Sequence, residues 1–539
     1  LNGSDSKAVF TFLKSHSGNN SGRYLEGFQR DVEGELFQTR VLQYVERDLN
    51  FFSLEYKKSF LESGLDVSVV GSYSENYQYE PDLRYFTSKV NEVIPGVFTY
   101  GNPTNNFNRP ARFWRYLNED KLSLSIDLQK DIIVTDRRGF IKVGGLVSTN
   151  ERDFKQYRID IYTPNRNPKL YNDVGGKDFE FFSRMGFIDR ESNTLGNFVF
   201  NASSPRDNYD GSSDMLSYYL MMSIPLTNST QLVGGARFEN VETIVASKDS
   251  TLEVGGFEGK DVLPSVSLIQ DIGERLKLRL NYSETVAYPT YRELAPYASY
   301  DFVGDLQFRG NAFLDITYMK NYDFRIETYL TPQEIVAVSV FFKEFSNPLE
   351  RVIRTDIGND ALSIQNVEEA IVYGAEFELR KNLGFFGSSF SGFSFTGNLT
   401  YVYSEVDIPE IELTEIRSQR PDASSSRQLT GQSPFIMNAD LSYQSKNERF
   451  QSTLSYNYTD DRLAIITEGA NPDIYERGRS LLNLNFKADI NNDIELSAKI
   501  NNLLNTNNEF SQNYLGSVYF YSLDKVGTDF SISVKYKFY

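Results

Sequence analysis

Phe-Ser-Ile-Ser-Val-Lys-Tyr-Lys-Phe runs from Phe530 to Phe538, next to the last residue of the chain. Apolar and aromatic residues occupy every second position, with serine or lysine between them. Because a β-strand has a side-chain period of two, one face of this segment is apolar and the other polar. The apolar face consists of Phe530, Ile532, Val534, Tyr536 and Phe538. Such a strand at the C-terminus is typical of the segment that closes an outer-membrane barrel.

The same alternation recurs along the chain, and it indicates half-buried strands. It is clearest in Arg275–Ser283, Phe450–Tyr458, Leu482–Ile490 and Ile494–Asn501. Six short polar segments separate alternating runs and predict hairpin turns. They are Leu61–Gly64, Thr227–Thr230, Asp271–Glu274, Thr331–Gln333, Lys446–Arg449 and Asn491–Asp493.

Long segments rich in Asn, Asp, Ser, Gly and Pro lie between the predicted hairpins. They cover roughly 81–114, 163–214, 287–317, 405–430, 459–476 and 506–524. Short turns that alternate with long loops are typical of a membrane barrel, whose turns face the periplasm and whose loops face outside. The prediction is therefore an all-β fold, a transmembrane antiparallel β-barrel.

We count about seventeen strands, or eighteen if Lys7–Leu13 is a strand. Residues 1–46 are predicted as an early barrel segment or an extracellular loop, and residues 47–539 as the C-terminal part of the barrel. The first clear strand, about 47–60, would run inward from outside, so we expect earlier strands upstream of it. Weak strands within Leu1–Gln43 are the alternative. An N-terminal plug domain is not recognised.

Composition limits the other classes of protein. No segment reaches the ~18 apolar residues of a membrane-spanning helix, and the mean hydropathy of −0.42 is compatible with a barrel. Aromatic residues make up 14% of the chain, which suits either interfacial girdles or a soluble all-β protein. The net charge of −18 argues against nucleic-acid binding.

No enzyme signature is found, so the protein is predicted not to be an enzyme. With no Cys and one His, the chain lacks thiol catalysis and a His-based triad. His16 lies in a polar segment and is interpreted as a solvated side chain. No metal site is predicted. A structural Ca²⁺ at the acidic residues Glu405, Asp407, Glu410, Glu412 and Glu415 is the alternative to a solvated loop.

Four motifs between residues 287 and 350 resemble a known family. They are Ala287-Tyr288-Pro289-Thr290-Tyr291-Arg292-Glu293-Leu294, Arg309-Gly310-Asn311-Ala312-Phe313-Leu314, Asn321-Tyr322-Asp323-Phe324-Arg325-Ile326-Glu327 and Phe341-Phe342-Lys343 followed by Pro348-Leu349-Glu350. In this order they resemble the barrel of TonB-dependent outer-membrane receptors, particularly of the Bacteroidetes type. Ala287-Tyr288-Pro289 departs from the usual Ser-Arg-Pro, and Ala312 stands where Pro is common. The resemblance covers about 45–539.

The resemblance implies a complete receptor with a plug inside a barrel of about 22 strands, and a Ton box that binds TonB. It implies uptake of a scarce ligand, such as a siderophore, oligosaccharide or peptide, across the outer membrane of a Gram-negative bacterium. Expected partners are outer-membrane lipid, TonB and the ligand. A docking barrel for a surface lipoprotein or a secretion complex is one alternative, and a passive pore is another.

Two sets of side chains are candidates for ligand binding. The aromatic residues Trp114, Tyr288, Tyr291, Tyr297 and Tyr300 lie at predicted strand–loop borders, where they would stack on a ligand or form an interfacial girdle. Arg112, Arg115, Arg292 and Arg309 would bind an anionic ligand or form ion pairs within the barrel wall. The polar strand faces, with Lys277, Arg279, Lys487 and Lys499, are expected to line the lumen.

Overall fold

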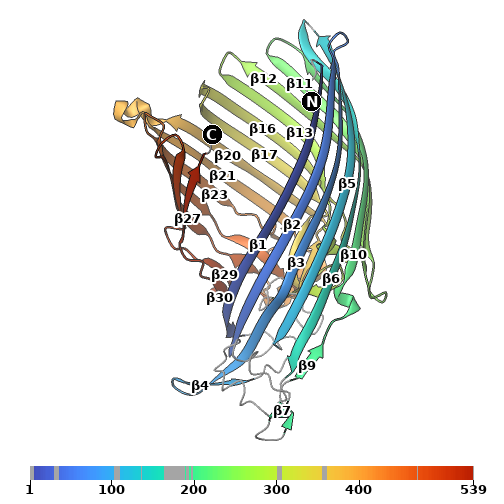
Figure 1. Cartoon of the computed structure of the whole chain (residues 1–539), viewed down its shortest axis with the longest axis vertical. Coiled ribbons are helices and arrows are strands. Elements are labelled where there is room, and N and C mark those ends of the chain that lie inside the picture. Colours follow the sequence, from blue (N-terminus) through green and yellow to red (C-terminus); the bar gives the residue numbers. More distant parts are fainter. Residues whose placement is uncertain are drawn as a thin grey trace.

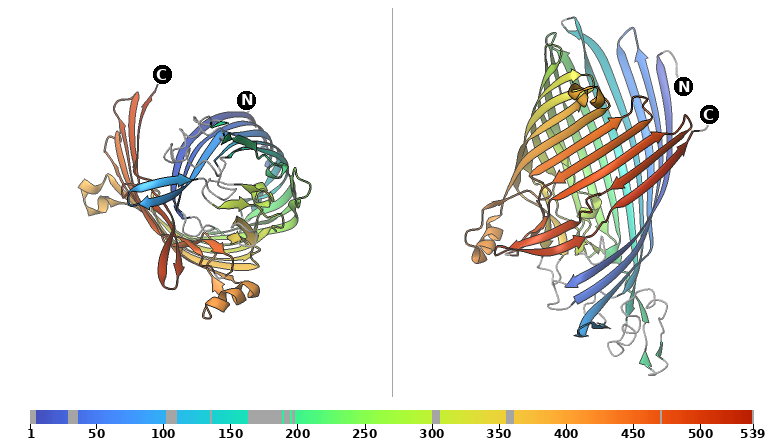
Figure 2. Two further views of the ribbon diagram at one scale, coloured as in Figure 1. Left: turned by 90° about the horizontal axis from the view of Figure 1, so that it is seen from below. Right: turned by 90° about the vertical axis from the view of Figure 1, so that its left-hand side faces the viewer.

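The computed structural model describes residues 5–28, 36–101, 110–134, 136–162, 188–189, 194–195, 198–299, 306–354, 361–469 and 471–537. Its strands lie side by side in one large antiparallel sheet that curves around an open interior (Figures 1 and 2). In this part of the chain, no helix combines the length and apolarity needed to cross a membrane.

Within these residues the large sheet has 21 strands, of which β4 (Val97–Gly101), β9 (Phe198–Asn201) and β22 (Ser426–Arg427) are short additions. The other eighteen pair in chain order, each with the next, and we call them the wall. The wall strands are β1 (Ser6–Phe28), β2 (Leu36–Phe60), β3 (Leu65–Ile94), β5 (Ala111–Val134), β6 (Arg137–Tyr162), β10 (Tyr209–Pro225), β11 (Thr230–Ser247), β12 (Gly255–Ile272), β13 (Leu276–Ala287), β16 (Thr317–Thr331), β17 (Glu334–Ser346), β20 (Glu369–Asn382), β21 (Phe393–Asp407), β23 (Phe435–Gln444), β24 (Phe450–Thr459), β27 (Arg479–Asp489), β28 (Ile494–Asn501) and β31 (Asp529–Tyr536). The all-β antiparallel barrel prediction is confirmed.

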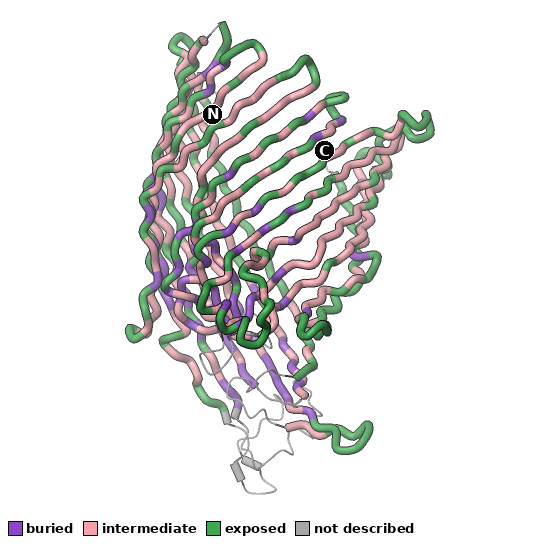
Figure 3. The backbone as a smooth tube through the Cα atoms, turned by 180° about the vertical axis from the view of Figure 1, so that it is seen from behind, coloured by how far each residue is buried: buried purple, intermediate pink, exposed green. Residues whose placement is uncertain are grey.

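The two faces of the wall differ as the alternation predicts. On β5 the exposed residues Leu122, Leu124 and Ile126 alternate with the half-buried Ser123 and Ser125. Exposed and partly covered positions also alternate along most of β10 and β16, whereas β27 is half-buried and β31 is exposed along its whole length (Figure 3). An exposed apolar row of this kind is the lipid-facing pattern of a membrane barrel, so this face is the outer one and the polar face lines the lumen.

All six predicted hairpin turns lie between consecutive wall strands. Gly64 and Gly273 adopt positive φ values of 60° and 64° in two of them, which a side chain would oppose. A seventh connection, between β20 and β21, contains the 3₁₀ turns η3 (Leu383–Phe386) and η4 (Ser388–Phe390).

The loop predicted over 81–114 is wrong for most of its length. β3 continues to Ile94 and β5 begins at Ala111. Tyr85, Phe86 and Val90 are all buried. Neighbouring positions are therefore covered on both faces, and the period-two pattern that reveals a half-buried strand disappears.

Several other long segments form a second sheet of eight short strands, which we call the rim sheet. Its strands, in spatial order, are β14 (Ala298–Ser299), β15 (Gln307–Arg309), β19 (Ala361–Asn366), β18 (Leu349–Arg354), β25 (Arg462–Thr467), β26 (Ile474–Glu476), β29 (Asn508–Tyr514) and β30 (Ser517–Asp524). They come from four different connections, all at the end of the wall opposite the short turns. Two of the pairings, β15 with β19 and β18 with β25, are parallel.

The smaller elements are the helices α3 (Tyr291–Leu294) and α4 (Glu410–Gln419), the 3₁₀ turn η2 (Pro205–Asp207) and the hairpin of β7 (Ile188–Asp189) with β8 (Thr194–Leu195). The segment 1–46 contains β1 and the first part of β2, so residue 46 lies inside a strand.

The predicted closing strand is β31, which pairs with β28. Phe530, Ile532, Val534 and Tyr536 are all exposed on it, and Phe538 lies outside the described residues. At the other end of the wall β1 pairs with β2. Within the described residues no ladder joins β1 to β31, and the red and blue ends of the wall stand apart (Figure 2).

Candidate functional site

The connection from β13 to β16 folds into the interior of the wall, near the end opposite the short turns (Figure 2). Its helix α3 is capped by Thr290, whose hydroxyl accepts a hydrogen bond from the backbone N–H of Glu293. The Glu293 carboxylate in turn accepts one from the Thr290 backbone N–H at 2.8 Å. This reciprocal capping box follows from the Thr-x-x-Glu spacing and fixes the short helix α3. We call residues 288–299 and 306–309 the inward segment.

Arg292 holds the inward segment together. Its guanidinium carbon lies 4.3 Å from the ring centre of Tyr297 and 4.2 Å from that of Phe308. The same side chain donates hydrogen bonds to the Ser299 hydroxyl at 2.6 Å and the Phe308 carbonyl at 3.1 Å. Because the guanidinium is stacked on two rings and hydrogen-bonded within the segment, Arg292 stabilises the segment.

Two glycines of the wall let the inward segment approach. A Cβ at Gly211 on β10 would lie 2.9 Å from Cδ1 of Tyr291, and one at Gly255 on β12 would lie 2.7 Å from the Leu294 carbonyl oxygen. Tyr291 is 7% exposed, and its hydroxyl donates to the Asn150 carbonyl at 3.1 Å. Burial raises the pKa of Tyr291 to about 12, so its hydroxyl remains a donor at neutral pH.

Three aromatic rings join the segment to the wall. Phe154 of β6, Tyr209 of β10 and Tyr297 lie with ring centres 5.3 to 5.5 Å apart. All three are buried and belong to a core that also contains Leu294. This packing anchors the segment to two neighbouring strands of the wall.

Tyr288 lies at the entrance to the segment. Its ring stacks on Phe257 at 5.3 Å, and its hydroxyl donates to the Glu239 carboxylate at 2.8 Å. Burial, together with that hydrogen bond, raises the pKa of Tyr288. Glu239 also pairs with Arg237, so the phenol is held by a charged pair on β11.

Where residues 288–291 of the inward segment face the wall, they line a hollow of about 380 Å³ together with wall side chains. It is lined by Lys121, Ser123, Leu146, Ser148, Asn150, Arg152, Ser213, Met215, Val241, Thr243, Phe257, Tyr288, Pro289, Thr290 and Tyr291. Hydroxyls, an amide and two cations are therefore combined with aromatic faces. Such a lining can hydrogen-bond a polar ligand and stack on its flat groups.

The structure brings together four of the predicted binding residues, Tyr288, Tyr291, Arg292 and Tyr297. Only the first two line the hollow. Arg309 is the last residue of the inward segment and is half-buried in β15, and Tyr300 lies outside the described residues.

The remaining predicted residues lie on β5 and make contacts within the wall. Arg115 is buried and donates to Gln156 at 2.8 Å and to Glu80 at 3.4 Å. Arg112 lies on the opposite face of the strand, 2.5 Å from an Asp82 oxygen, with its guanidinium over the ring of Trp114. These are the ion pairs of the alternative interpretation.

Sequence reasoning did not single out Arg152 or Lys121. Arg152 lies over the Tyr291 ring at 5.0 Å and pairs with Glu119, its register partner on β5. Lys121 precedes the alternating run that begins at Leu122, so its lumen orientation could be inferred, whereas Arg152 lies between Glu151 and Asp153 and has no such signal. Their proximity to Tyr291 depends on the fold of a distant connection.

A second polar cluster lies in the rim sheet, beside the apolar residues Val352, Leu463 and Ile466. Arg427 donates to Glu350 at 2.8 Å, and both side chains are buried. Burial raises the pKa of Glu350 and of Asp473, which share this region with Glu412. Three carboxylates thus surround one buried guanidinium.

The acidic segment proposed for Ca²⁺ becomes the end of β21 and α4. In the residues with described positions, its carboxylates are not gathered within metal-ligand reach.

Two of the cations predicted to line the lumen form ion pairs there. The lumen-facing Arg279 bonds Glu327 at 3.0 Å, and Lys487 bonds Glu495 at 3.0 Å.

A family comparison identifies this architecture. The model of the TonB dependent receptor-like β-barrel matches residues 3–503. The chain belongs to the TonB-dependent receptor family. It is therefore an outer-membrane protein of Gram-negative bacteria that acts in transport and is not an enzyme. Receptors of this family interact with TonB and bind small molecules. The Bacteroidetes affinity stays a prediction.

Solved structures share the fold at low sequence identity. The siderophore receptor PiuA from Acinetobacter baumannii is 11% identical, with a TM-score of 0.56 over 100% of this chain and 82% of that one. The ferric-catecholate import receptor Fiu from Escherichia coli K12 is 10% identical, with a TM-score of 0.55 over 99% and 81%. The pyoverdine receptor FpvA from Pseudomonas aeruginosa is 12% identical, with a TM-score of 0.53 over 99% and 79%. Curated proteins gave no match.

Proposed function

We propose that this TonB-dependent receptor takes up a ligand of the siderophore class, and that the hollow behind the inward segment forms part of its path. The supporting observation is the lining of that hollow, in which Lys121 and Arg152 lie near Tyr288 and Tyr291. Siderophores offer flat chelating groups and oxygen acceptors, which suit stacking and charge-assisted hydrogen bonds. The receptors PiuA, Fiu and FpvA are named for ligands of this class.

Energy from TonB is the second part of the proposal. The barrel supplies a wall whose lumen face is polar and whose outer face is apolar, and receptors of this family are transporters and not enzymes. Transport against a gradient therefore needs an external energy source, and the family uses TonB.

Uptake of radiolabelled ferric siderophores by cells that produce the receptor tests both parts. We expect uptake of at least one hydroxamate or catecholate complex, and its loss when TonB is deleted. Uptake that persists without TonB would indicate a passive pore. Absence of uptake, with a surface lipoprotein co-purified in stoichiometric amount, would indicate a docking barrel.

A substitution tests the role of the hollow. Lys121→Gln removes a charge from its lining and should raise the KM for uptake roughly tenfold, because a hydrogen bond to a charged group contributes about 1.5–3 kcal/mol. Lys130 lies on the same strand but outside the hollow, so Lys130→Gln serves as the control. Equal KM values for both variants would remove the hollow from the path.

A further inference from the structure

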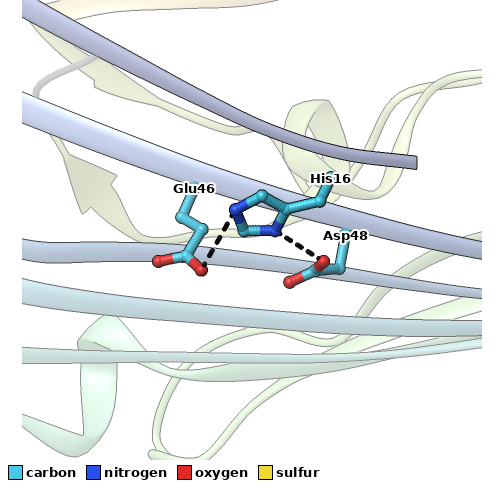
Figure 4. Close-up of side chains that lie close together, drawn as sticks. All are labelled: His16, Glu46 and Asp48. Atoms are coloured by element: carbon cyan, nitrogen blue, oxygen red, sulfur yellow. Dashed lines mark hydrogen bonds and ion pairs between the residues drawn. The ribbon is translucent and has the colours of Figure 1, made fainter. Parts of the chain in front are cut away.

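The one histidine of the chain faces two carboxylates across a strand pair (Figure 4). His16 of β1 is directly opposite Asp48 of β2, and Glu46 is opposite Gly18. The Nδ1 atom lies 2.8 Å from an Asp48 oxygen, and Nε2 lies 3.7 Å from a Glu46 oxygen. Because Gly18 has no side chain, nothing from β1 competes with Glu46 for the space beside the imidazole.

This cluster lies on the outer face of the wall. Phe10, Phe12 and His16 occupy alternate positions of β1, and Phe12 stacks on Phe52 of β2. Phe10 and Phe12 are exposed and belong to the apolar band. His16 is two residues after Lys14 on the same face of β1, toward the end of the strand that is opposite the short turns. Its side chain is 53% exposed, so ions reach it from outside without entering the lumen.

The distances suit a small divalent cation. Zinc bonds of about 2.0–2.1 Å place two ligands of a tetrahedral ion roughly 3.4 Å apart. The observed 3.7 Å between Nε2 and the Glu46 oxygen is close to that separation. Asp48 accepts the Nδ1–H, which fixes the imidazole tautomer that leaves Nε2 free to bind.

The local charge favours the same conclusion. With a neutral imidazole the cluster carries the two negative charges of Glu46 and Asp48, which a dication would balance. Lys14 is the nearest cation on this face of β1. Arg47 points to the other face and donates to Gln78 at 2.8 Å. A nitrogen ligand favours Zn²⁺ over Ca²⁺ and Mg²⁺, which prefer oxygen.

We propose that Nε2 of His16 and the Glu46 carboxylate bind Zn²⁺ on the outer face of the wall, with Asp48 as a positioning residue and water in the remaining positions. The ion would link β1 to β2 by side chains, in addition to their backbone ladder. Within the described residues β1 pairs with β2 alone, so such a link would reinforce the one ladder that holds β1.

Calorimetric titration of the purified receptor in detergent with ZnCl₂ at pH 7.5 tests the site. We expect one Zn²⁺ per chain and at least tenfold weaker binding of MgCl₂ and CaCl₂. His16→Asn and Glu46→Gln should abolish zinc binding, and Asp48→Asn should weaken it about 10–100-fold. The matched control is Asp120→Asn, which removes another outward carboxylate, bonded to the Tyr73 hydroxyl at 2.7 Å.

Hydrogen exchange gives an independent readout. Zinc should slow exchange of the β1 amides near His16 in the wild type and in Asp120→Asn, with no effect in His16→Asn. Zinc affinity should fall from pH 7.5 to 5.5, because protons compete for the imidazole. Unchanged zinc binding in His16→Asn, or an equal loss in Asp120→Asn, would overturn the proposal.

Discussion

The first and last strands of the wall reach different heights. β2, β3 and β5 have 25, 30 and 24 residues, whereas β23, β28 and β31 have 10, 8 and 8. A strand that crosses a membrane needs about 9–11 residues. The early strands therefore continue far beyond the membrane as one ladder, and the late strands end close to its edge (Figure 1).

Beyond the membrane the two regions satisfy their backbone groups differently. The early strands keep the same neighbour along most of their length, as β2 and β3 do. The late connections instead pair with each other in the rim sheet, where β18 meets β25 from a different hairpin. Contacts between residues that are distant in sequence hold the rim sheet together. We call the parts of β2, β3 and β5 beyond the membrane the early extension. We expect single substitutions to disrupt the rim sheet more than they disrupt the early extension.

The largest expected effect tests the centre of the rim. Arg427→Leu leaves the Glu350 carboxylate buried without its cation, which costs about 3–5 kcal/mol. Amides of β18 and β25 should lose hydrogen-exchange protection by that amount, while those of β2 and β3 keep theirs. Hydrogen exchange with mass spectrometry measures both regions in one sample.

The control for this substitution is Arg417→Leu, on the exposed side of α4. Its guanidinium donates to the Ala423 carbonyl at 3.2 Å, and the site is solvated. Loss at this position should cost less than about 1 kcal/mol. If both variants leave the rim equally protected, the buried pair does not distinguish the rim from the early extension.

A second substitution asks whether the inward segment depends on distant contacts as the rim does. Gly211→Val places new atoms where the Tyr291 ring lies, since even a Cβ there would be 2.9 Å from it. Overpacking of this kind costs about 1–3 kcal/mol. We expect faster exchange across α3 and a change in the hollow that Tyr291 lines.

Gly71→Val is the matched change in the early strands. A Cβ at Gly71 of β3 has no atom within 4 Å. Valine suits a strand facing lipid, so the protection of β3 should be kept or increased. Equal losses at Gly71 and Gly211 would show that a glycine-to-valine change weakens any strand, whether or not it contacts the inward segment.

The same contrast explains what the sequence could predict. The alternation over Arg275–Ser283 predicts β13, and the turns predict the hairpins, because each signal is local. The rim sheet has strands as short as the two residues of β14, which carry no periodicity, and its pairings join different connections. Tyr288 and Tyr291 could be selected as candidates by residue type. Their inward position depends on Gly211 and Gly255, which lie on other strands.

His16 is a second case in which the sequence could not predict a contact. Its sequence neighbours are polar and suggest a solvated side chain, yet the ladder places Asp48, 32 residues away, 2.8 Å from its ring. Only the register of β1 against β2 brings the two together, and a register is not visible in composition or spacing.

A smaller, pH-dependent effect is expected in the rim. Burial raises the pKa of Asp473 above its ordinary value, in a region that also holds Glu350, Glu412, Arg427 and Arg420. The folded state thus binds the proton more tightly than the unfolded state. Its contribution to stability is complete below the ordinary pKa of 3.8 and is lost as the pH rises through the raised, folded value.

Asp473→Asn tests this dependence, because asparagine resembles the protonated carboxyl and its oxygen can still accept from the Thr467 amide. Wild-type amides of β25 and β26, corrected for intrinsic exchange, should be better protected at pH 5 than at pH 8. The variant should show a smaller difference and greater protection at pH 8. The opposite slope would mean that the pair with Arg427 keeps these carboxyls ionised.

The smallest expected effect concerns the contact between the two regions. Arg23 of β1 lies 3.9 Å from Asp524 of β30, and the Asp524 side chain is 50% exposed. Solvent-exposed ion pairs contribute about 0–1 kcal/mol, so Asp524→Asn should change protection of β1 and β30 by less than that. A larger loss on both strands at once would mean that the early extension and the rim open as one cooperative unit. A small loss means that the early extension and the rim sheet are each stabilised by their own strand pairing. That result is expected if the two regions fold independently on the same barrel.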